Sequence, residues 1–292
     1  MIHRGLRVLP ILLSVLIGCS GGEETSPPSV KFLEPEHDQY DAKIDFARLE
    51  HEFPLRPADL MTITPKNLEA LTQEQVDQIY ARLAAGPIPD GSYDGRMFFP
   101  KGASGQARTA EIVGGFKGKV VNFTKAKLDQ IGEAVWKGKV FYRDQRILRN
   151  RIDDLLVLKP LLGDDIGKIQ KQETDGKDAW LLFPAKLYCG QSLLDGRRES
   201  IIIDYAFSDD VPGYRPMPDV LAGRDGLKIR DEIRMIRPGF YLGRAYMNRA
   251  FVLNFTLYNP TVAEKEKAAF QQAGTVHEDC EIGSQRMTAM AK

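Results

Sequence analysis

The chain has 292 residues, with 40 basic and 40 acidic side chains and a formal net charge of zero. Balanced charge argues against a nucleic-acid partner, because such proteins usually carry a basic stripe that meets the phosphates. The length allows one large domain or two small ones, each with a sizeable core.

Residues 1–19 have the layout of a secretory signal. Basic side chains come first, the apolar run Val8–Ile17 follows, and the segment ends in Leu16-Ile17-Gly18-Cys19. The apolar run is too short to cross a bilayer as a helix, whereas its length and flanks are typical of a signal peptide.

The last four residues of this segment resemble the bacterial lipobox, in which cleavage precedes the cysteine. The resemblance implies that Cys19 becomes the acylated N-terminus and anchors the protein to a membrane. Ser20, in place of Asp, resembles outer-membrane cargo of enteric-type sorting. We therefore expect a lipoprotein on the periplasmic face of the outer membrane. An ordinary signal peptide with an incidental cysteine is the alternative.

Two cysteines remain if Cys19 is acylated. Cys189 and Cys280 would then be an even pair in an oxidising compartment, which predicts a disulfide. A metal site is the alternative, because His277 and Cys280 have the short spacing of a ligand pair. No second pair accompanies them, so no metal is expected.

The N-terminal third begins with a polar stretch. Gly21–Pro35 is typical of a flexible tether, and Glu36–Pro65 is expected to contain little regular structure. Leu71–Ala85 is predicted to be a helix, because apolar side chains recur on one face and Thr72 with Gln75 forms a capping-box pattern.

Turn signals and short apolar segments alternate through the middle of the chain. The Asp-Gly steps at residues 90–95 lack calcium-loop spacing, and the glycine-rich Lys101–Gly118 lacks the Gly-Lys-Ser/Thr of a phosphate cradle, so no cofactor is expected. Asn150–Leu162 suits either a strand or an amphipathic helix. The other predicted elements are a helix at Lys125–Trp136, loops at Asp164–Asp178 and Asp209–Asp225, and strands at Arg96–Phe99, Lys139–Tyr142, Ala179–Tyr188 and Glu199–Phe207.

Lys228–Tyr258 predicts an antiparallel meander of three strands. Pro238-Gly239 suits a tight turn, and Asn248 tolerates the left-handed conformation that a second turn requires. A helix capped by Thr261 is expected to follow and to run to about Ala273, before Gly274.

Alternation of side chains assigns the faces of this meander. Asp231 and Ile233 share an apolar face of the first strand. Arg230, Glu232 and Arg234 share the other face, which is expected to contact water.

Two charges therefore fall on largely apolar faces, and a charge buried alone is very costly. We predict that Arg244 pairs with Asp231 or Asp204 inside a barrel. This anchor, together with Tyr246, would hold the head group of an apolar ligand. A structural ion pair, or a one-residue bulge that returns Arg244 to solvent, would explain the same pattern.

The predicted fold class is mainly β (α+β). About seven to nine mostly antiparallel strands, with flanking helices and no βαβ alternation, favour a closed barrel over a sandwich. The architecture resembles that of the lipocalins, although their Gly-x-Trp signature does not occur. The predicted organisation is a signal peptide at 1–18, a tether and irregular segment at 19–66, the barrel at 67–260, and a helix and tail at 261–292.

The leading functional hypothesis is a membrane-anchored protein that binds an apolar small molecule or lipid in the barrel. A structural lipoprotein that docks on an envelope protein through an exposed apolar patch is the second hypothesis. An enzyme is the third, but no Gly-x-Ser-x-Gly elbow occurs and no histidine lies in the predicted barrel. Asp231 and Glu232 beside Tyr241 would suit acid–base work; no catalytic residue is assigned.

Overall fold

A computed structural model describes residues 26–34, 44–99, 136–159, 163–274 and 277–280. Cys19, the predicted signal, and all of the predicted helix at 125–136 except Trp136 lie outside these residues. Trp136 itself begins a strand.

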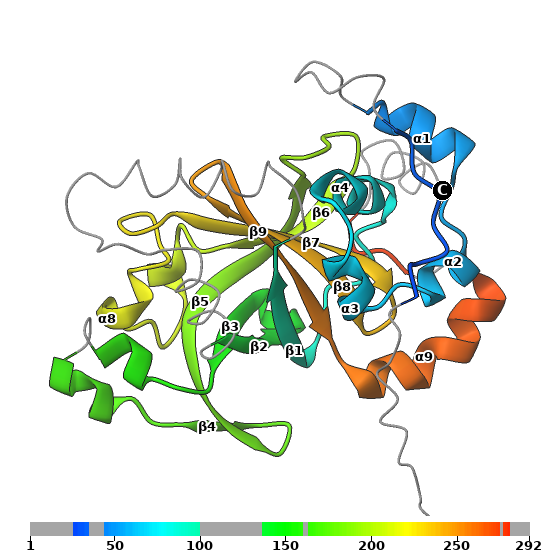
Figure 1. Cartoon of the computed structure of the whole chain (residues 1–292). Coiled ribbons are helices and arrows are strands. Elements are labelled where there is room, and N and C mark those ends of the chain that lie inside the picture. The colour runs from blue at the N-terminus through cyan, green and yellow to red at the C-terminus, as the bar shows by residue number, and fades with distance from the viewer. Residues whose placement is uncertain (1–25, 35–43, 100–135, 160–162, 275–276, 281–292) are drawn as a thin grey trace, which may run out of the picture.

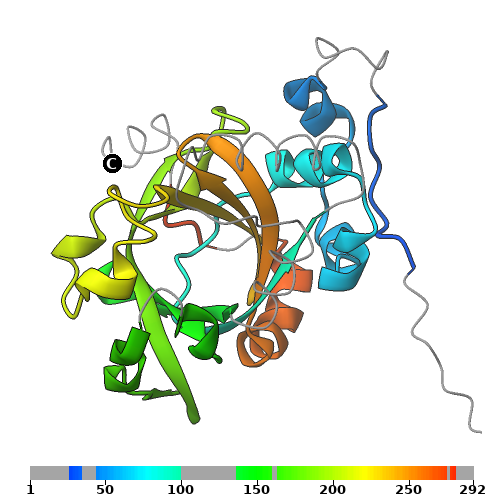
Figure 2. The same ribbon diagram turned by 60° about the vertical axis from the view of Figure 1, so that its left-hand side comes forward.

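Eight antiparallel strands close into a barrel, as Figures 1 and 2 show from two sides. Each strand pairs with its neighbours in the order β1-β2-β3-β5-β6-β7-β8-β9, and β9 pairs again with β1. The predicted antiparallel barrel is therefore confirmed. Its strands are β1 Gly91–Phe98, β2 Trp136–Tyr142, β3 Ile147–Ile152, β5 Lys177–Gln191, β6 Glu199–Asp204, β7 Ile229–Arg237, β8 Phe240–Met247 and β9 Ala250–Tyr258.

Several of these strands are longer than the sequence predicts. β1 begins at Gly91, so Asp94-Gly95 lies within a strand rather than in a turn. Ladder hydrogen bonds to β2 and β9 hold this segment extended. The undecided stretch at 150–162 contains the end of β3 and the short 3-10 helix η2 Leu156–Leu158. The predicted loop at 164–178 holds the 3-10 helix η3 Gly163–Lys168 and strand β4 Gln172–Thr174, which pairs with β5.

The meander is confirmed as β7, β8 and β9. Gly239 and Asn248 both have positive φ, at 72° and 60°, as the two predicted turns require. Between β6 and β7 the chain makes the loop that the sequence predicts, with the 3-10 helix η4 Ser208–Asp210 and the short helix α8 Pro216–Asp219.

The barrel interior holds the largest apolar cluster of the described residues. Strand alternation places Phe141, Leu148, Ile203 and Leu257 in this cluster, whereas Val140 belongs to a separate cluster outside the barrel. At about 25 cal/mol per Å² of apolar surface, burial of these side chains is the main favourable term for folding.

Four short helices lie on the outer side of β7 and β8 (Figure 1); the last three bury apolar side chains against these strands, and the first packs against the fourth. They are α1 Phe46–Glu52, α2 Pro57–Met61, α3 Pro65–Glu69 and α4 Gln73–Arg82. The expectation of little regular structure at 36–65 was therefore wrong. Asp45 caps α1 by accepting from Ala47 N, and Pro57 presets the first turn of α2.

The helix predicted at 71–85 is confirmed as α4, with the Thr72 and Gln75 capping box in place. It ends at Arg82 because the following residues run extended beside β7, where Ala84 O accepts from Met235 N at 2.9 Å. None of the described helices has the length and apolarity that a membrane span needs.

The C-terminal helix α9 spans Pro260–Ala273 and ends at Gly274, as expected. Its cap is Asn259, whose side chain accepts from Val262 N, so the predicted cap Thr261 was wrong. Pro260 suits the first helical position, because the N–H that it lacks would have no partner within the helix. The helix therefore begins at Pro260 rather than after Thr261.

The predicted disulfide is present between Cys189 in β5 and Cys280. Asp279, the residue before Cys280, is bound to the same end of the barrel. Its Oδ2 accepts from Ile88 N at 2.7 Å, and its N donates to Gly86 O. The disulfide and these two hydrogen bonds keep the C-terminal segment on the barrel.

A glycine at position 138 is required by the barrel wall. Gly138 has φ of 135°, and an added Cβ would lie 1.9 Å from the backbone oxygen of Tyr93 in β1. We expect Gly138→Ala to lower the free energy of unfolding by about 2 kcal/mol or more, because both the clash and the backbone strain must be relieved.

Urea unfolding followed by circular dichroism measures this effect. Gly196→Ala is the matched control, because no heavy atom lies within 4 Å of the added Cβ. Equal stability of the two variants would contradict the packing described for Gly138.

Candidate functional site

Buried polar side chains gather in two clusters on opposite faces of the barrel wall. Asp231 pairs in register with Ala245, whereas the next residue, Glu232, pairs with Arg244. Adjacent side chains point to opposite faces of a strand, so Asp231 faces the interior and Arg244 faces outward.

The inner cluster is centred on Lys139, which is 2 % exposed. Its ammonium donates to Tyr205 OH at 2.7 Å, Asn150 Oδ1 at 2.9 Å and Asp231 Oδ2 at 3.0 Å. An ammonium has three donors, and all three are used here. Trp136 Nε1 donates to the same Asn150 oxygen at 2.9 Å.

The cluster crosses the interior rather than following the wall. Lys139 lies in β2 and Asp231 in β7, which are separated by β1, β9 and β8 on one side of the ring. Asn150 also donates to Phe183 O at 3.0 Å and to Tyr205 OH at 3.0 Å. These bonds fix the distance between opposite walls of the barrel.

The electrostatics favour a charged lysine. Burial lowers the pKa of Lys139, but the negative charge of Asp231 and the bond to Tyr205 outweigh burial and raise its pKa. The rings of Trp136 and Phe255 lie 5.3 and 5.4 Å from the ammonium, within cation–π range. Burial raises the pKa of Tyr205 to about 12, so its hydroxyl stays protonated at neutral pH.

Partly buried apolar side chains surround the cluster at one end of the barrel. They lie near the end of β1, in β5 and β8, and at the starts of β2, β7 and β9, which all meet at that end. We call them the apolar ring: Met97, Trp136, Phe183, Ile229, Ala245 and Leu253. Opposite this end the interior is filled by fully buried side chains such as Ile201, Ile233 and Tyr241.

The outer cluster lies between α4 and β8. Arg244 pairs with Asp77 of α4, donates from Nε to Tyr246 OH at 2.9 Å, and stacks 4.3 Å from the Phe251 ring centroid. Burial lowers the pKa of Arg244, but Asp77 and Tyr246 together outweigh burial and raise the pKa. The predicted pairing of Arg244 with Asp231 or Asp204 inside the barrel was therefore wrong.

The packing of α4 on the outer face explains why the predicted pairing of Arg244 was wrong. The face that carries Arg244 and Tyr246 is apolar because α4 covers it, not because it lines the interior. Arg234 is buried here and donates to Tyr80 O of α4. Glu232 is buried under the β5–β6 connection, where it accepts from Leu193 N. Both are 0 % exposed, so the expectation that they contact water was also wrong.

Of the four predicted ligand-binding residues, only Asp231 faces the interior. Asp204 accepts from the exposed Tyr188 hydroxyl at 2.7 Å, and Tyr246 accepts from Arg244 outside the barrel. Sequence reasoning missed Lys139, Asn150 and Tyr205. Alternation offered a signal for all three, because each stands two residues from a core side chain: Phe141, Leu148 or Ile203.

Comparisons with known proteins add little. No protein-family model matches this chain, and no curated protein matches its sequence. A crystal structure of a protein from Thermomonospora curvata is 16% identical, covers 65% of this chain and 88% of its own, and has a TM-score of 0.34. A likeness this weak carries nothing about activity.

Removing one partner of the buried ion pair between Lys139 and Asp231 should destabilise the fold. We expect Lys139→Met to lower the free energy of unfolding by about 3–5 kcal/mol, because Asp231 is left as an uncompensated buried charge. The double variant Lys139→Met/Asp231→Leu should recover most of this loss. A double-mutant cycle in urea measures the coupling, and simple additivity of the two changes would contradict the pairing.

Alkaline pH should weaken the barrel. Lys139 and Tyr205 have folded-state pKa values above their unfolded values of about 10, so their stabilisation is complete below about pH 10. It is lost as pH rises through the folded-state pKa values, which for Tyr205 is about 12. Urea midpoints measured from about pH 8 to 11 should fall less steeply in Tyr205→Phe than in the wild type. The same decrease of the urea midpoint with pH in both proteins would contradict the raised pKa of Tyr205.

Proposed function

We propose that this protein is a membrane-anchored envelope lipoprotein that binds an amphipathic small molecule at the apolar ring. The acyl anchor would be Cys19, on the basis of the lipobox resemblance. The apolar part of the ligand would contact the ring, and its polar group would approach the cluster around Lys139.

The observation that carries this proposal is that the apolar ring and the polar cluster lie together at one end of the barrel. Small-molecule sites are usually concave and mostly apolar, with a few fixed polar groups. The apolar ring provides partly exposed apolar side chains, and Lys139, Asp231, Asn150 and Tyr205 provide the polar groups. Each of these four side chains is held by at least two hydrogen bonds, which supports a preorganised site.

The polar groups also favour a ligand class. Asp231 already balances the charge of Lys139, so the cluster is close to neutral and offers no free charge to a strongly ionic head group. An alcohol, ester or amide head group would replace one of the hydrogen bonds that Tyr205 and Asn150 make within the cluster, because both side chains donate and accept.

Ligand binding can be measured with Trp136 as reporter. The chain has two tryptophans, so Trp180→Phe leaves Trp136 as the only one. We expect dodecanol, monolaurin or the apolar dye N-phenylnaphthylamine to change Trp136 emission. In the same background, Leu253→Gln should weaken binding about tenfold, since a buried leucine is worth about 1.5–3 kcal/mol.

Leu193→Gln is the matched control, because Leu193 is 42% exposed in the β5–β6 connection at the opposite end of the barrel. Native mass spectrometry of the purified protein tests for a co-purified lipid. The proposal is overturned if none of the three probes changes Trp136 emission and native mass spectrometry detects no bound lipid. It is also overturned if the two leucine variants weaken binding equally. Globomycin-sensitive processing and palmitate labelling at Cys19 test the anchor separately.

A further inference from the structure

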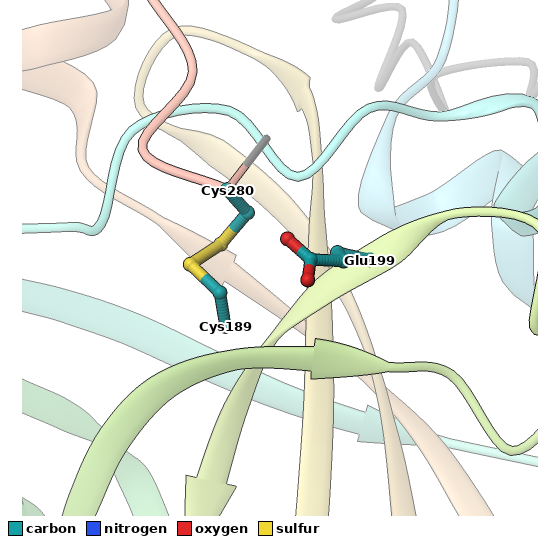
Figure 3. A group of neighbouring side chains, drawn as sticks. All are labelled: Cys189, Glu199 and Cys280. Atoms are coloured by element: carbon teal, nitrogen blue, oxygen red, sulfur yellow. A yellow bond between two sulfur atoms is a disulfide. The ribbon is translucent and has the colours of Figure 1, made fainter. Parts of the chain in front are cut away.

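Cys189, Glu199 and Cys280 meet at the end of the barrel opposite the apolar ring. Figure 3 shows the Glu199 carboxylate beside the disulfide and pointing toward it. One sulfur from each cysteine and one oxygen of Glu199 all lie within 4.8 Å of one another. Cys280 is 3 % exposed, and the other two are half-buried.

The strands place two of the three side chains on one face. Cys189 pairs with Ile201 and Gln191 with Glu199 across β5 and β6. Cys189 and Glu199 are therefore diagonal neighbours on the face that Ile201 presents to the interior. Cys280 reaches them from the C-terminal segment, which Asp279 holds through Ile88 N and Gly86 O.

We propose that, after reduction of the disulfide, these three side chains bind one zinc ion or a similarly thiophilic divalent cation. Two thiolates and a carboxylate are a ligand set that Zn²⁺ accepts, with a fourth position left for water. Tetrahedral Zn–S bonds of about 2.3 Å place two sulfurs roughly 3.8 Å apart. The Cα atoms of Cys189 and Cys280 are 5.3 Å apart, so side-chain rotation can reach that spacing.

The two states are alternative cross-links between the same chain segments. A phosphine and one water reduce the disulfide: two electrons break the S–S bond, two thiols form, and the phosphine becomes its oxide. The metal then displaces the two thiol protons into solvent. Both cross-links hold the C-terminal segment on β5, but only the metal form uses Glu199.

Competition titration tests the site in the full-length mature protein. The protein is reduced with a phosphine under nitrogen, freed of the phosphine, and titrated with Zn²⁺ against a chromophoric zinc indicator. We expect one Zn²⁺ per chain in the reduced form and none at this site in the oxidised form. Co²⁺ should give a thiolate charge-transfer band in the reduced form alone.

Glu199→Gln should weaken Zn²⁺ binding at least about tenfold, which is the lower range for loss of a group that supports a metal site. Glu173→Gln is the matched control, because Glu173 is an exposed residue of β4. Both variants are purified oxidised and then reduced, so that folding precedes the test.

Three results would overturn the proposal: no stoichiometric Zn²⁺ in the reduced wild type, equal affinity in the two glutamate variants, or equal binding by the oxidised protein. The Co²⁺ band reports thiolate ligation directly. Its absence in the reduced wild type therefore counts against the site even if the reduced chain loosens.

Discussion

Closure of the sheet is the constraint on which the rest of this structure depends. Pairing of β3 with β5 and of β9 with β1 satisfies the backbone groups that an open sheet would leave at its edges. Closure also creates an interior that water cannot reach from the sides. Any charged side chain that alternation directs inward must then find its partner across that interior, as Lys139 and Asp231 do.

The same wall has a second buried face. Helices α2, α3 and α4 cover the outside of β7 and β8, so both faces of these strands hold buried polar groups. The two sets have different consequences. Arg244 and Asp77 join a helix to the barrel, whereas Lys139 and Asp231 join opposite walls beneath the apolar ring.

The two ends of the barrel also differ. At one end the partly exposed side chains of the apolar ring surround the buried polar cluster of Lys139. At the other end the interior is filled, and the C-terminal segment is fastened by a disulfide and by Asp279. The proposed ligand site and the proposed metal site therefore lie at opposite ends of the barrel.

The amino-acid sequence by itself determined the antiparallel meander, the barrel class, the α4 capping box and the pairing of Cys189 with Cys280, because each rests on local spacing or on a small number of cysteines. It also determined that Asp231 and Arg244 sit on apolar faces. Only the tertiary structure decided which apolar face is the interior, since a helix packed on the outside produces the same alternation as a barrel core. Lys139 contacts Asp231, which lies 92 residues away in the sequence, and no local pattern predicts a contact over that separation.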